Sequence, residues 1–339
     1  MKIFATRLIP EAGQTILESA ADVDVAVRVE DALVPRDKIL AGIRDADVLV
    51  SLLTEAVDRE VLAAGTSLRG VANYAVGYNN IDVAAATELG IPVTNTPGVL
   101  TDTTADLAWT LLMAAARNVV PADRYMRSGK YKIWGPSLFL GVDVSKGGDG
   151  RSKVLGIVGF GRIGRAMFRR AQGFDMRVIA FDPPLRELID ETDGVDYAEM
   201  DELLAESDFV SLHTDLNDTT HHLIGAAELT AMKSDACLIN TARGPIIDEK
   251  ALVAALASGE IGAAGLDVFE GEPAMAEGLN ELDNAVILPH IASASRDTRN
   301  KMATMCAENA LAHLELARAP NCVNPEVYDT AAYRERAAE

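Results

Sequence analysis

The sequence predicts an α/β protein of two domains, each built on a parallel β-sheet. Short runs of β-branched and other apolar residues alternate with helical stretches, as expected for strands that helices cover on both faces of a sheet. This alternation occurs in two separate series along 339 residues, a length that suits about two domains. A glycine-rich turn opens the second series.

The first hundred residues contain alternating predicted strands and helices. The strands are residues 2–6, 24–27, 48–53, 70–74 and 91–95. The helices, in which apolar residues recur at helical spacing, are residues 10–20, 35–43, 57–65 and 80–90. A long apolar stretch at 101–118 predicts a further helix that starts at a capping Thr101 or Asp102 and is buried or part of an interface.

The second series begins at residue 154. Before it lie an irregular segment at 125–144 and a polar, glycine-rich stretch at 145–153, which predicts an exposed loop. The predicted strands are residues 154–160, 177–182, 208–213, 236–240, 263–268 and 285–289. A final helix is predicted over about 295–318.

Composition narrows the classes of function. A formal net charge of −20 argues against nucleic-acid and membrane partners, because both are anionic. The arginines of residues 169–177 are expected to form the solvated face of a helix. Three separated cysteines predict no disulfide framework, and no apolar run is long enough for a signal peptide or a membrane span. We therefore expect a soluble cytoplasmic protein.

The glycine-rich turn indicates a dinucleotide site. Gly159, Gly161 and Gly164 form a G-x-G-x-x-G pattern between an apolar strand and a helix, and the next strand ends in Asp182. In a Rossmann domain these glycines allow a tight turn, close approach of a pyrophosphate and close helix packing, while the acidic residue binds the ribose. Asp182 favours NAD over NADP, although Arg186 is near enough to bind a 2′-phosphate.

Three polar residues each follow a predicted strand of the second series. They are Arg243, Glu272 and His290. Taken alone, a histidine such as His290 in ILPHIASAS is more often structural than catalytic. Because the carboxyl ends of parallel strands share one edge with the glycine loop, we expect the three side chains to lie near a bound nicotinamide. An arginine fork suits a carboxylate, and a histidine beside a carboxylate suits proton transfer.

The stretches NTARGPIIDE, GLDVFEGEP, LPHIASAS, GFGRIGRA and NYAVGYNNID resemble the D-isomer-specific 2-hydroxyacid dehydrogenase family. The resemblance extends from about residue 45 to residue 318, and Arg243, Glu272 and His290 have the spacing of the family pattern. VLTDTTADLAWTLLMAAAR and KIWGPSLFLG resemble the glyoxylate/hydroxypyruvate reductase branch.

This resemblance implies an NAD-dependent enzyme, with NADH preferred over NADPH, that acts on CH–OH donors. It would reduce a small 2-oxoacid, glyoxylate or hydroxypyruvate, to the D-2-hydroxyacid by hydride transfer. Arg243 would bind the substrate carboxylate and carbonyl, and His290 would be the general acid of reduction and the base of oxidation. Glu272 would hold the imidazole and raise its proton affinity.

The resemblance also implies the contact residues. Those expected to contact NAD are Thr104, Gly159, Gly161, Arg162, Ile163, Gly164, Asp182, His213, Thr214, Thr220, Thr241, Ala242, Arg243, Asp267 and His290. Those expected to contact the substrate are Leu53, Val76, Gly77, Trp134, Arg243 and His290. The backbone amides around Val76 and Gly77 would cradle the substrate carboxylate, whereas His213 fits a structural role as easily as a cofactor contact.

The domain layout follows from the same resemblance. Residues 101–291 would form an NAD-binding Rossmann domain, inserted into a flavodoxin-like substrate-binding domain made of residues 1–100 and 292–339. A cleft between the two would close on the ligand and exclude water. A homodimer through the NAD-binding domain is expected, with Trp134 either reaching the neighbouring subunit's active site or packed in the core.

Several alternatives stay open. The same chemistry could act on 3-phosphoglycerate, D-lactate or a larger 2-oxoacid, and a non-enzymatic NAD-sensing corepressor could keep the same three residues. His221 and His222 could suggest a metal site, but without a further ligand cluster we expect a surface pair and no metal. Ala292 stands where glycine is common in the family, and residues 145–153 are longer than the usual connection.

Overall fold

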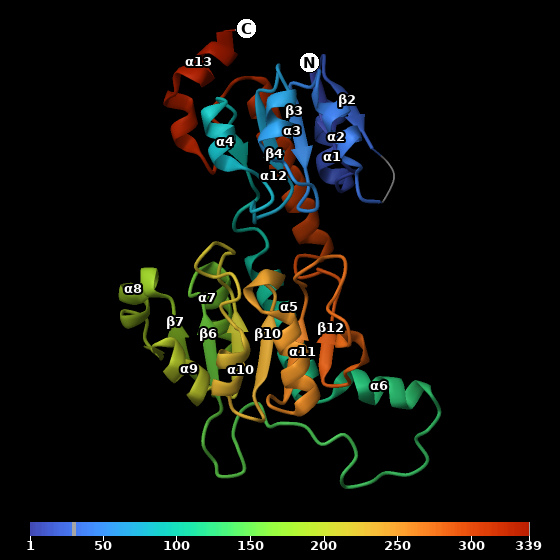
Figure 1. Ribbon diagram of the computed structural model, residues 1–339, viewed down its shortest axis with the longest axis vertical. Helices are drawn as coiled ribbons and strands as arrows, with labels where there is room; N and C mark the ends of the chain where they lie inside the picture. Colours follow the sequence, from blue (N-terminus) through green and yellow to red (C-terminus); the bar gives the residue numbers. More distant parts are fainter. Residues whose placement is uncertain (29–31, 339) are drawn as a thin grey trace. The chain divides into compact units, whose positions relative to one another are not determined.

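A computed structural model describes residues 1–28 and 32–338 (Figure 1). The chain divides into two compact units. The terminal unit comprises residues 1–100 and 294–339, and the central unit comprises residues 101–293. Each unit contains one wholly parallel sheet, so the predicted fold class of two parallel-sheet α/β domains is confirmed.

The terminal unit contains a five-stranded sheet in the order β2-β1-β3-β4-β5. Its strands are β1 (Lys2–Ala5), β2 (Asp24–Val27), β3 (Val48–Ser51), β4 (Gly70–Asn73) and β5 (Val93–Thr94). Its helices are α1 (Glu11–Glu18), α2 (Arg36–Ile43), α3 (Arg59–Ala64), α4 (Val83–Glu88), α12 (Arg296–Leu314) and α13 (Ala331–Ala338).

Two apolar cores lie on opposite faces of this sheet. Val48 and Val50 of β3 pack with residues of α1 and α12, whereas Leu49 packs with residues of α2, α3 and α4. Successive residues of a strand point to opposite faces, and both faces are buried at β3, which explains why this central strand is mostly apolar. Gly13 allows α1 and α12 to touch, because a Cβ there would lie 2.4 Å from the Ala303 oxygen.

The central unit contains a seven-stranded sheet in the order β12-β11-β10-β9-β6-β7-β8. Its strands are β6 (Val154–Val158), β7 (Arg177–Phe181), β8 (Val195–Tyr197), β9 (Phe209–Leu212), β10 (Cys237–Asn240), β11 (Ala263–Leu266) and β12 (Ala285–Ile287). Its helices are α5 (Thr101–Ala116), α6 (Val119–Arg127), α7 (Arg162–Gln172), α8 (Arg186–Asp190), α9 (Met200–Glu206), α10 (Ala226–Ala231) and α11 (Glu249–Ser258).

This sheet is also covered on both faces. One core joins apolar residues of the sheet with α5 and α7, and the other joins them with α9, α10 and α11. The chain order reverses where β6 lies between β9 and β7. In open α/β sheets, ligands bind beyond the carboxyl ends of the strands at such a reversal. The fold therefore places the binding edge of the central unit directly after β6.

The predicted elements match the structure except in a few places. No range was predicted from the sequence for the strand β8 or for the helices α6, α8, α9, α10, α11 and α13. The helix predicted over 101–118 ends at Ala116, because Asn118 has a left-handed backbone with φ 51° before α6 begins. The final helix ends at Leu314 rather than near residue 318, and Leu316 is likewise left-handed.

The stretch from α6 to residue 140 exposes many apolar side chains. Figure 1 shows α6 and the segment after it extending away from the sheet of the central unit. The exposed large apolar residues of this stretch are Val119, Met126, Tyr131, Ile133, Trp134, Leu138 and Leu140. The predicted loop at 145–153 is a tight hairpin, in which the Gly147 amide donates to the Arg151 oxygen at 2.9 Å. Within the described residues, no helix has the length and apolar character needed to cross a membrane.

Candidate active site

The glycine loop lies between β6 and α7, as the sequence predicts. Gly159 has φ 92°, and a Cβ there would lie 2.6 Å from the His213 carbonyl carbon. A Cβ on Gly164 would lie 2.1 Å from the Gly159 oxygen, so only glycine lets the helix approach the strand. A Cβ on Gly161 would meet no atom within 4 Å. The loop is thus tightly packed behind and open in front, at the N-terminus of an 11-residue helix.

Asp182 contacts the glycine loop directly. Asp182 Oδ2 accepts a hydrogen bond from the Phe160 amide at 2.8 Å, which holds the carboxylate at the end of β7. In dinucleotide-binding folds an acidic residue here accepts hydrogen bonds from the adenosine ribose. The nearby Arg186 lies over the ring of Tyr197, 4.2 Å from its centroid, and its guanidinium is 3.6 Å from a Glu199 oxygen.

Arg243 follows β10 and is held by its own loop. Its Nη1 donates to the Ala242 oxygen at 2.7 Å, and its main-chain oxygen accepts from Asn240 Nδ2 at 2.8 Å. Asn240 Oδ1 also accepts from the Ala242 amide at 2.9 Å. Burial lowers the pKa of Arg243, while the charges of Glu272 and Asp215 oppose that shift. An arginine stays charged under such conditions, so the edge retains a cation suited to a carboxylate or carbonyl oxygen.

His290 and Glu272 form a hydrogen-bonded pair at the same edge. His290 Nδ1 lies 2.9 Å from Glu272 Oε2, and the side chains are 26% and 30% exposed. Burial alone would raise the pKa of Glu272, but the hydrogen bond from His290, the Phe269 amide at 3.0 Å and the charge of Arg243 lower it overall. Glu272 is therefore an ionised acceptor that occupies Nδ1 and leaves Nε2 of the ring for another partner.

The backbone around His290 is held in an unusual conformation. His290 has a left-handed φ of 54°, which is uncommon for residues other than glycine. The two carboxylate oxygens of buried Asp267 accept from the amides of Ile291 and Ala292, each at 2.7 Å. Asp267, expected from the resemblance to contact NAD, thus positions the turn that carries His290. Left-handed non-glycine residues often occur at functional sites.

Of the other residues expected to contact the cofactor, three directly follow strands of the central sheet and one lies near the start of α5. Thr104 is buried near the start of α5, and Thr241 is buried directly after β10. His213 and Thr214 follow β9, where burial lowers the pKa of His213 to about 3 and Ser211 Oγ lies 2.8 Å from its Nε2. His213 is therefore neutral. Its contact with Ser211 fits the structural alternative, and its role toward a cofactor stays a prediction.

The residues expected to contact the substrate outside the central unit follow two strands of the terminal unit. Leu53 lies in the loop after β3, and Val76 and Gly77 lie after β4. Asn95 Nδ2 donates to the Val76 oxygen at 2.7 Å, and Asn73 Nδ2 donates to the Gly77 oxygen at 2.9 Å. Both carbonyls are thus turned toward asparagine side chains of the unit itself.

Glu55 is a functional candidate that the sequence did not single out. It is only 3% exposed, and its Oε2 accepts from the Leu52 amide at 2.9 Å and from Thr6 Oγ1 at 3.0 Å. Arg7 lies 3.6 Å from its other oxygen. Glu55 therefore connects the loop after β3, which contains Leu52 and Leu53, to the end of β1. No local motif marks it, because its partners come from two strands.

The structure corrects one expectation for an individual residue and adds a neighbour to another. Trp134 is 72% exposed, so core packing, one of its two predicted roles, is wrong for this chain. His221 and His222 lie near the surface, where Glu270 is a third potential ligand that the sequence did not indicate. His222 Nε2 lies 2.8 Å from Glu270 Oε1, and one ligand atom from each of the three residues lies within 4.8 Å of the others.

Fold and site together define a class of protein. A glycine loop between β6 and α7, with Asp182 beside it, is the dinucleotide-binding arrangement of Rossmann domains. The same unit carries a half-buried arginine and a histidine–glutamate pair. These features are those of a nicotinamide-dependent oxidoreductase.

Comparisons with known proteins give the family. The model of the D-isomer specific 2-hydroxyacid dehydrogenase NAD-binding domain matches residues 109–292. The glyoxylate reductase of Korarchaeum cryptofilum (strain OPF8) is 51% identical over 96% of each chain. A crystal structure of a protein from Thermus thermophilus has a TM-score of 0.87 at 41% identity, over 95% of this chain and 100% of the other. The chain belongs to the D-isomer-specific 2-hydroxyacid dehydrogenase family.

A further solved relative bears on the cofactor. An NADPH-dependent glyoxylate/hydroxypyruvate reductase from Sinorhizobium meliloti, in complex with NADP and malonate, has a TM-score of 0.80 at 31% identity. It covers 96% of this chain and 97% of its own. The family model is described as an NAD-binding domain, whereas this solved relative is named for NADPH.

Proposed function

We propose that this protein reduces glyoxylate or hydroxypyruvate to the D-2-hydroxyacid with NADH. The observation that carries the proposal is the His290–Glu272 pair at 2.9 Å, with the charge of Arg243 acting on Glu272. The choice of substrate is supported by relatives named glyoxylate reductase at 45–51% identity. NADH, when bound, supplies the hydride that reduces the substrate carbonyl carbon.

The residues of the glycine loop fit a dinucleotide. The open space in front of Gly161 lies at the N-terminus of α7, where backbone amides and the helix dipole favour phosphate. Asp182, held by the Phe160 amide, is placed to accept hydrogen bonds from ribose hydroxyls. The proposed cofactor site therefore uses Gly159, Gly161 and Gly164 for the turn and Asp182 for the ribose.

The polar residues divide the chemistry among them. Arg243 binds the substrate carboxylate and polarises the carbonyl oxygen, because its planar fork matches two acceptor oxygens. His290 donates the proton on Nε2 to that oxygen in reduction, and takes one from the alcohol in oxidation. Ionised Glu272 accepts from Nδ1, which orients the ring and stabilises its protonated form. Proton transfer of this kind contributes on the order of 10²–10⁴ in rate.

We further propose that NADH is preferred over NADPH. The carboxylate of Asp182 would repel a 2′-phosphate placed near the ribose. Arg186 is the nearby cation that could compensate, but it stacks on Tyr197 and lies near the carboxylates of Glu199 and Asp190. The Sinorhizobium meliloti relative uses NADPH, so family membership alone does not decide the preference.

A homodimer through the central unit is proposed as well. The exposed apolar side chains between residues 119 and 140 are concentrated in one stretch of the chain, as in surfaces that associate. Trp134, 72% exposed, would then be covered by the partner and reach its active site. Light scattering of the wild type and of Trp134→Ser tests this: a wild-type monomer contradicts it. A cytoplasmic location stays a prediction.

The decisive experiment is a panel of 2-oxoacids assayed with NADH and NADPH in parallel. We expect the highest kcat/KM with glyoxylate or hydroxypyruvate and NADH. Higher kcat/KM with pyruvate, 3-phosphohydroxypyruvate or a larger 2-oxoacid would move the substrate assignment to that compound. Tight NADH binding without turnover of any 2-oxoacid would contradict the enzyme and favour a sensor.

A further inference from the structure

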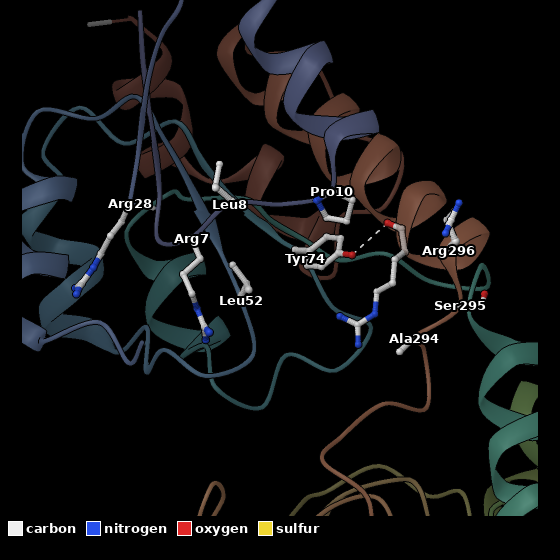
Figure 2. A pocket seen from close by; sticks show the side chains of 10 residues that line it. Arg7, Leu8, Pro10, Arg28, Leu52, Tyr74, Ala294, Ser295 and Arg296 are labelled. Carbon is white, nitrogen blue, oxygen red and sulfur yellow. Dashed lines mark hydrogen bonds between the residues drawn. The ribbon is translucent and has the colours of Figure 1, made fainter. Parts of the chain in front are cut away.

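A pocket in the terminal unit gathers four arginines at the edge where its strands end. The pocket has a volume of about 690 Å³, which suits a small organic ligand. Arg7 follows β1, Arg28 follows β2, and Arg296 and Arg299 belong to the first turns of α12. Figure 2 shows Arg7 and Arg28 extending toward the same side, with Arg296 at the other end of the pocket.

All the charged side chains among the described residues that line this pocket are arginines, although the chain as a whole is acidic. The formal net charge is −20, yet none of the described residues that line the pocket is acidic. Glu55 compensates Arg7 in part, at 3.6 Å. Guanidinium groups in a recess, partly shielded from water, attract anions more strongly than isolated surface charges do. The pocket is therefore built for an anionic ligand rather than for a neutral one.

The two arginines of α12 stand where a helix normally disfavours them. Positive charges near a helix N-terminus oppose the helix dipole, and acidic residues are the favourable choice there. Ser295 caps this 19-residue helix, and its first turn also contains Asp297, the acidic residue that the dipole favours. Arg296 and Arg299 oppose the dipole, so helix stability alone does not explain their placement. An anion between them and the helix end would be favoured by both the dipole and the side chains.

Much of the remaining wall of the pocket is apolar. Leu8, Pro10 and Leu52 line it together with Tyr74, whose hydroxyl donates to the Arg299 oxygen at 3.1 Å. Leu52 directly precedes Leu53, which was expected to contact the substrate. Arginines on several sides with an apolar wall suit two anionic groups joined by a short carbon chain.

We propose that this pocket binds a small carboxylic acid that carries a second anionic group, either a carboxylate or a phosphate. The ligand has two possible sources, the 2-oxoacid substrate itself or a separate effector. Where the ligand is the substrate, the inference rests on the proposed function and narrows its substrate class. Where the ligand is an effector, it is independent of that function.

Binding is tested first, in the absence of cofactor, so that it does not depend on turnover. Calorimetry compares malonate with propionate, which has a similar chain but only one carboxylate. The variants are Arg296→Gln, Arg28→Gln and the double variant, and the matched control is Arg44→Gln, an exposed arginine of the same unit outside the pocket. We expect wild type and Arg44→Gln to bind malonate, and the double variant to bind it about tenfold or more weakly.

Kinetics then separates the two sources. If the pocket holds the substrate, the double variant loses at least about tenfold more kcat/KM for oxaloacetate than for glyoxylate. If it holds an effector, malonate changes the kcat or KM of glyoxylate reduction in the wild type and not in the double variant. Both outcomes support the proposal that the pocket binds a small dianionic acid, and they identify that ligand as the substrate or as an effector.

Two results would overturn the inference. One is wild-type protein that binds malonate and 3-phosphoglycerate no better than propionate. The other is a double variant that melts at the wild-type temperature and still binds malonate as wild type does. Failure of the proposed function gives a different pattern, because malonate would still bind while no 2-oxoacid was reduced.

Discussion

The two sheets of this molecule carry different chemistry at equivalent edges. Beyond the strand ends of the central unit lie a glycine loop, an acidic ribose partner and a histidine–glutamate pair. Beyond those of the terminal unit lie four arginines against an apolar wall. The first edge suits phosphate binding by backbone and proton transfer by side chains, and the second suits anionic groups bound by guanidinium.

This difference shows how one architecture is adapted by its loops. Parallel strands bring their carboxyl ends together whatever the loop sequences are, so the edge is a position rather than a function. In the central unit, short motifs after β6, β7, β10, β11 and β12 supply the chemistry. In the terminal unit, residues from β1, β2 and the much later helix α12 supply it together.

The largest expected effect is at Arg243. Arg243→Ala removes the cation of the central edge, and we expect kcat/KM for glyoxylate to fall by about 10²–10⁴. Arg243→Lys keeps the charge but not the planar fork, so it should recover only part of the loss. Steady-state assays measure both. Full activity of Arg243→Ala would mean that substrate binding does not depend on Arg243. It would contradict the assignment of substrate binding to the edge of the central unit.

Glu272→Gln tests the proton-transfer half of the comparison. The pKa of Glu272 is lowered, so its charge is present above the ordinary carboxyl range and is lost only as the pH falls below that range. Glutamine never carries the charge, and we expect reduction to fall by about ten- to a hundredfold. In the wild type, activity should also decline at acid pH as Glu272 becomes protonated, and this decline should be missing from the kcat/KM profile of the variant. An unchanged pH profile would mean that the charge of Glu272 takes no part in proton transfer.

Asp182→Ser tests the cofactor-binding role that is assigned to the edge of the central unit. Asp182→Ser keeps a short polar side chain at the end of β7 and removes the charge. We expect kcat/KM with NADH to fall about tenfold, because the ribose hydrogen bonds weaken. Activity with NADPH should fall less than activity with NADH, or rise. The preference for NADH over NADPH should therefore become smaller. Parallel titrations of the two cofactors measure the ratio, and an unchanged ratio would remove Asp182 as the source of selectivity.

The last prediction concerns stability in the terminal unit and no change of activity. Burial lowers the pKa of His313 to about 4 from 6.5, so the folded chain stays neutral there where the unfolded chain binds a proton. The free energy of unfolding should therefore fall as the pH drops from about 6.5 to about 4, by roughly 3 kcal/mol from this residue.

His313→Gln provides the control for that window. Glutamine does not titrate and can still reach Thr94, whose Oγ1 lies 3.2 Å from His313 Nε2. Urea unfolding at several pH values should show a shallower pH dependence for the variant. His213 is present in both proteins, so its own contribution cancels in the comparison. Equal slopes would contradict a neutral His313 in the folded chain.

The predictability of the two edges from the sequence differs for a physical reason. The glycine loop and Asp182 could be predicted because a strand, a turn and a helix are contiguous in the chain and each glycine answers a local steric need. Arg243, Glu272 and His290 could be placed at one edge because each follows a predicted strand of the same series.

The remainder depended on contacts between distant segments. Arg296 and Arg299 look like ordinary helix residues until the fold sets them beside Arg7 and Arg28. Glu270 beside His222 was likewise invisible, because 48 residues separate them. The role of Asp267 as an acceptor for two amides requires the left-handed turn at His290, which no residue preference predicts.

The most direct test of the account is the turnover of NADH by wild type and by His290→Gln, assayed side by side with glyoxylate and hydroxypyruvate. His221→Asn, an exposed histidine of the same unit, is the matched control. We predict rapid NADH oxidation by the wild type and by the control. For His290→Gln we predict a kcat lower by about 10²–10⁴, with NADH binding retained. Robust turnover by His290→Gln, or none by wild type, would contradict the account.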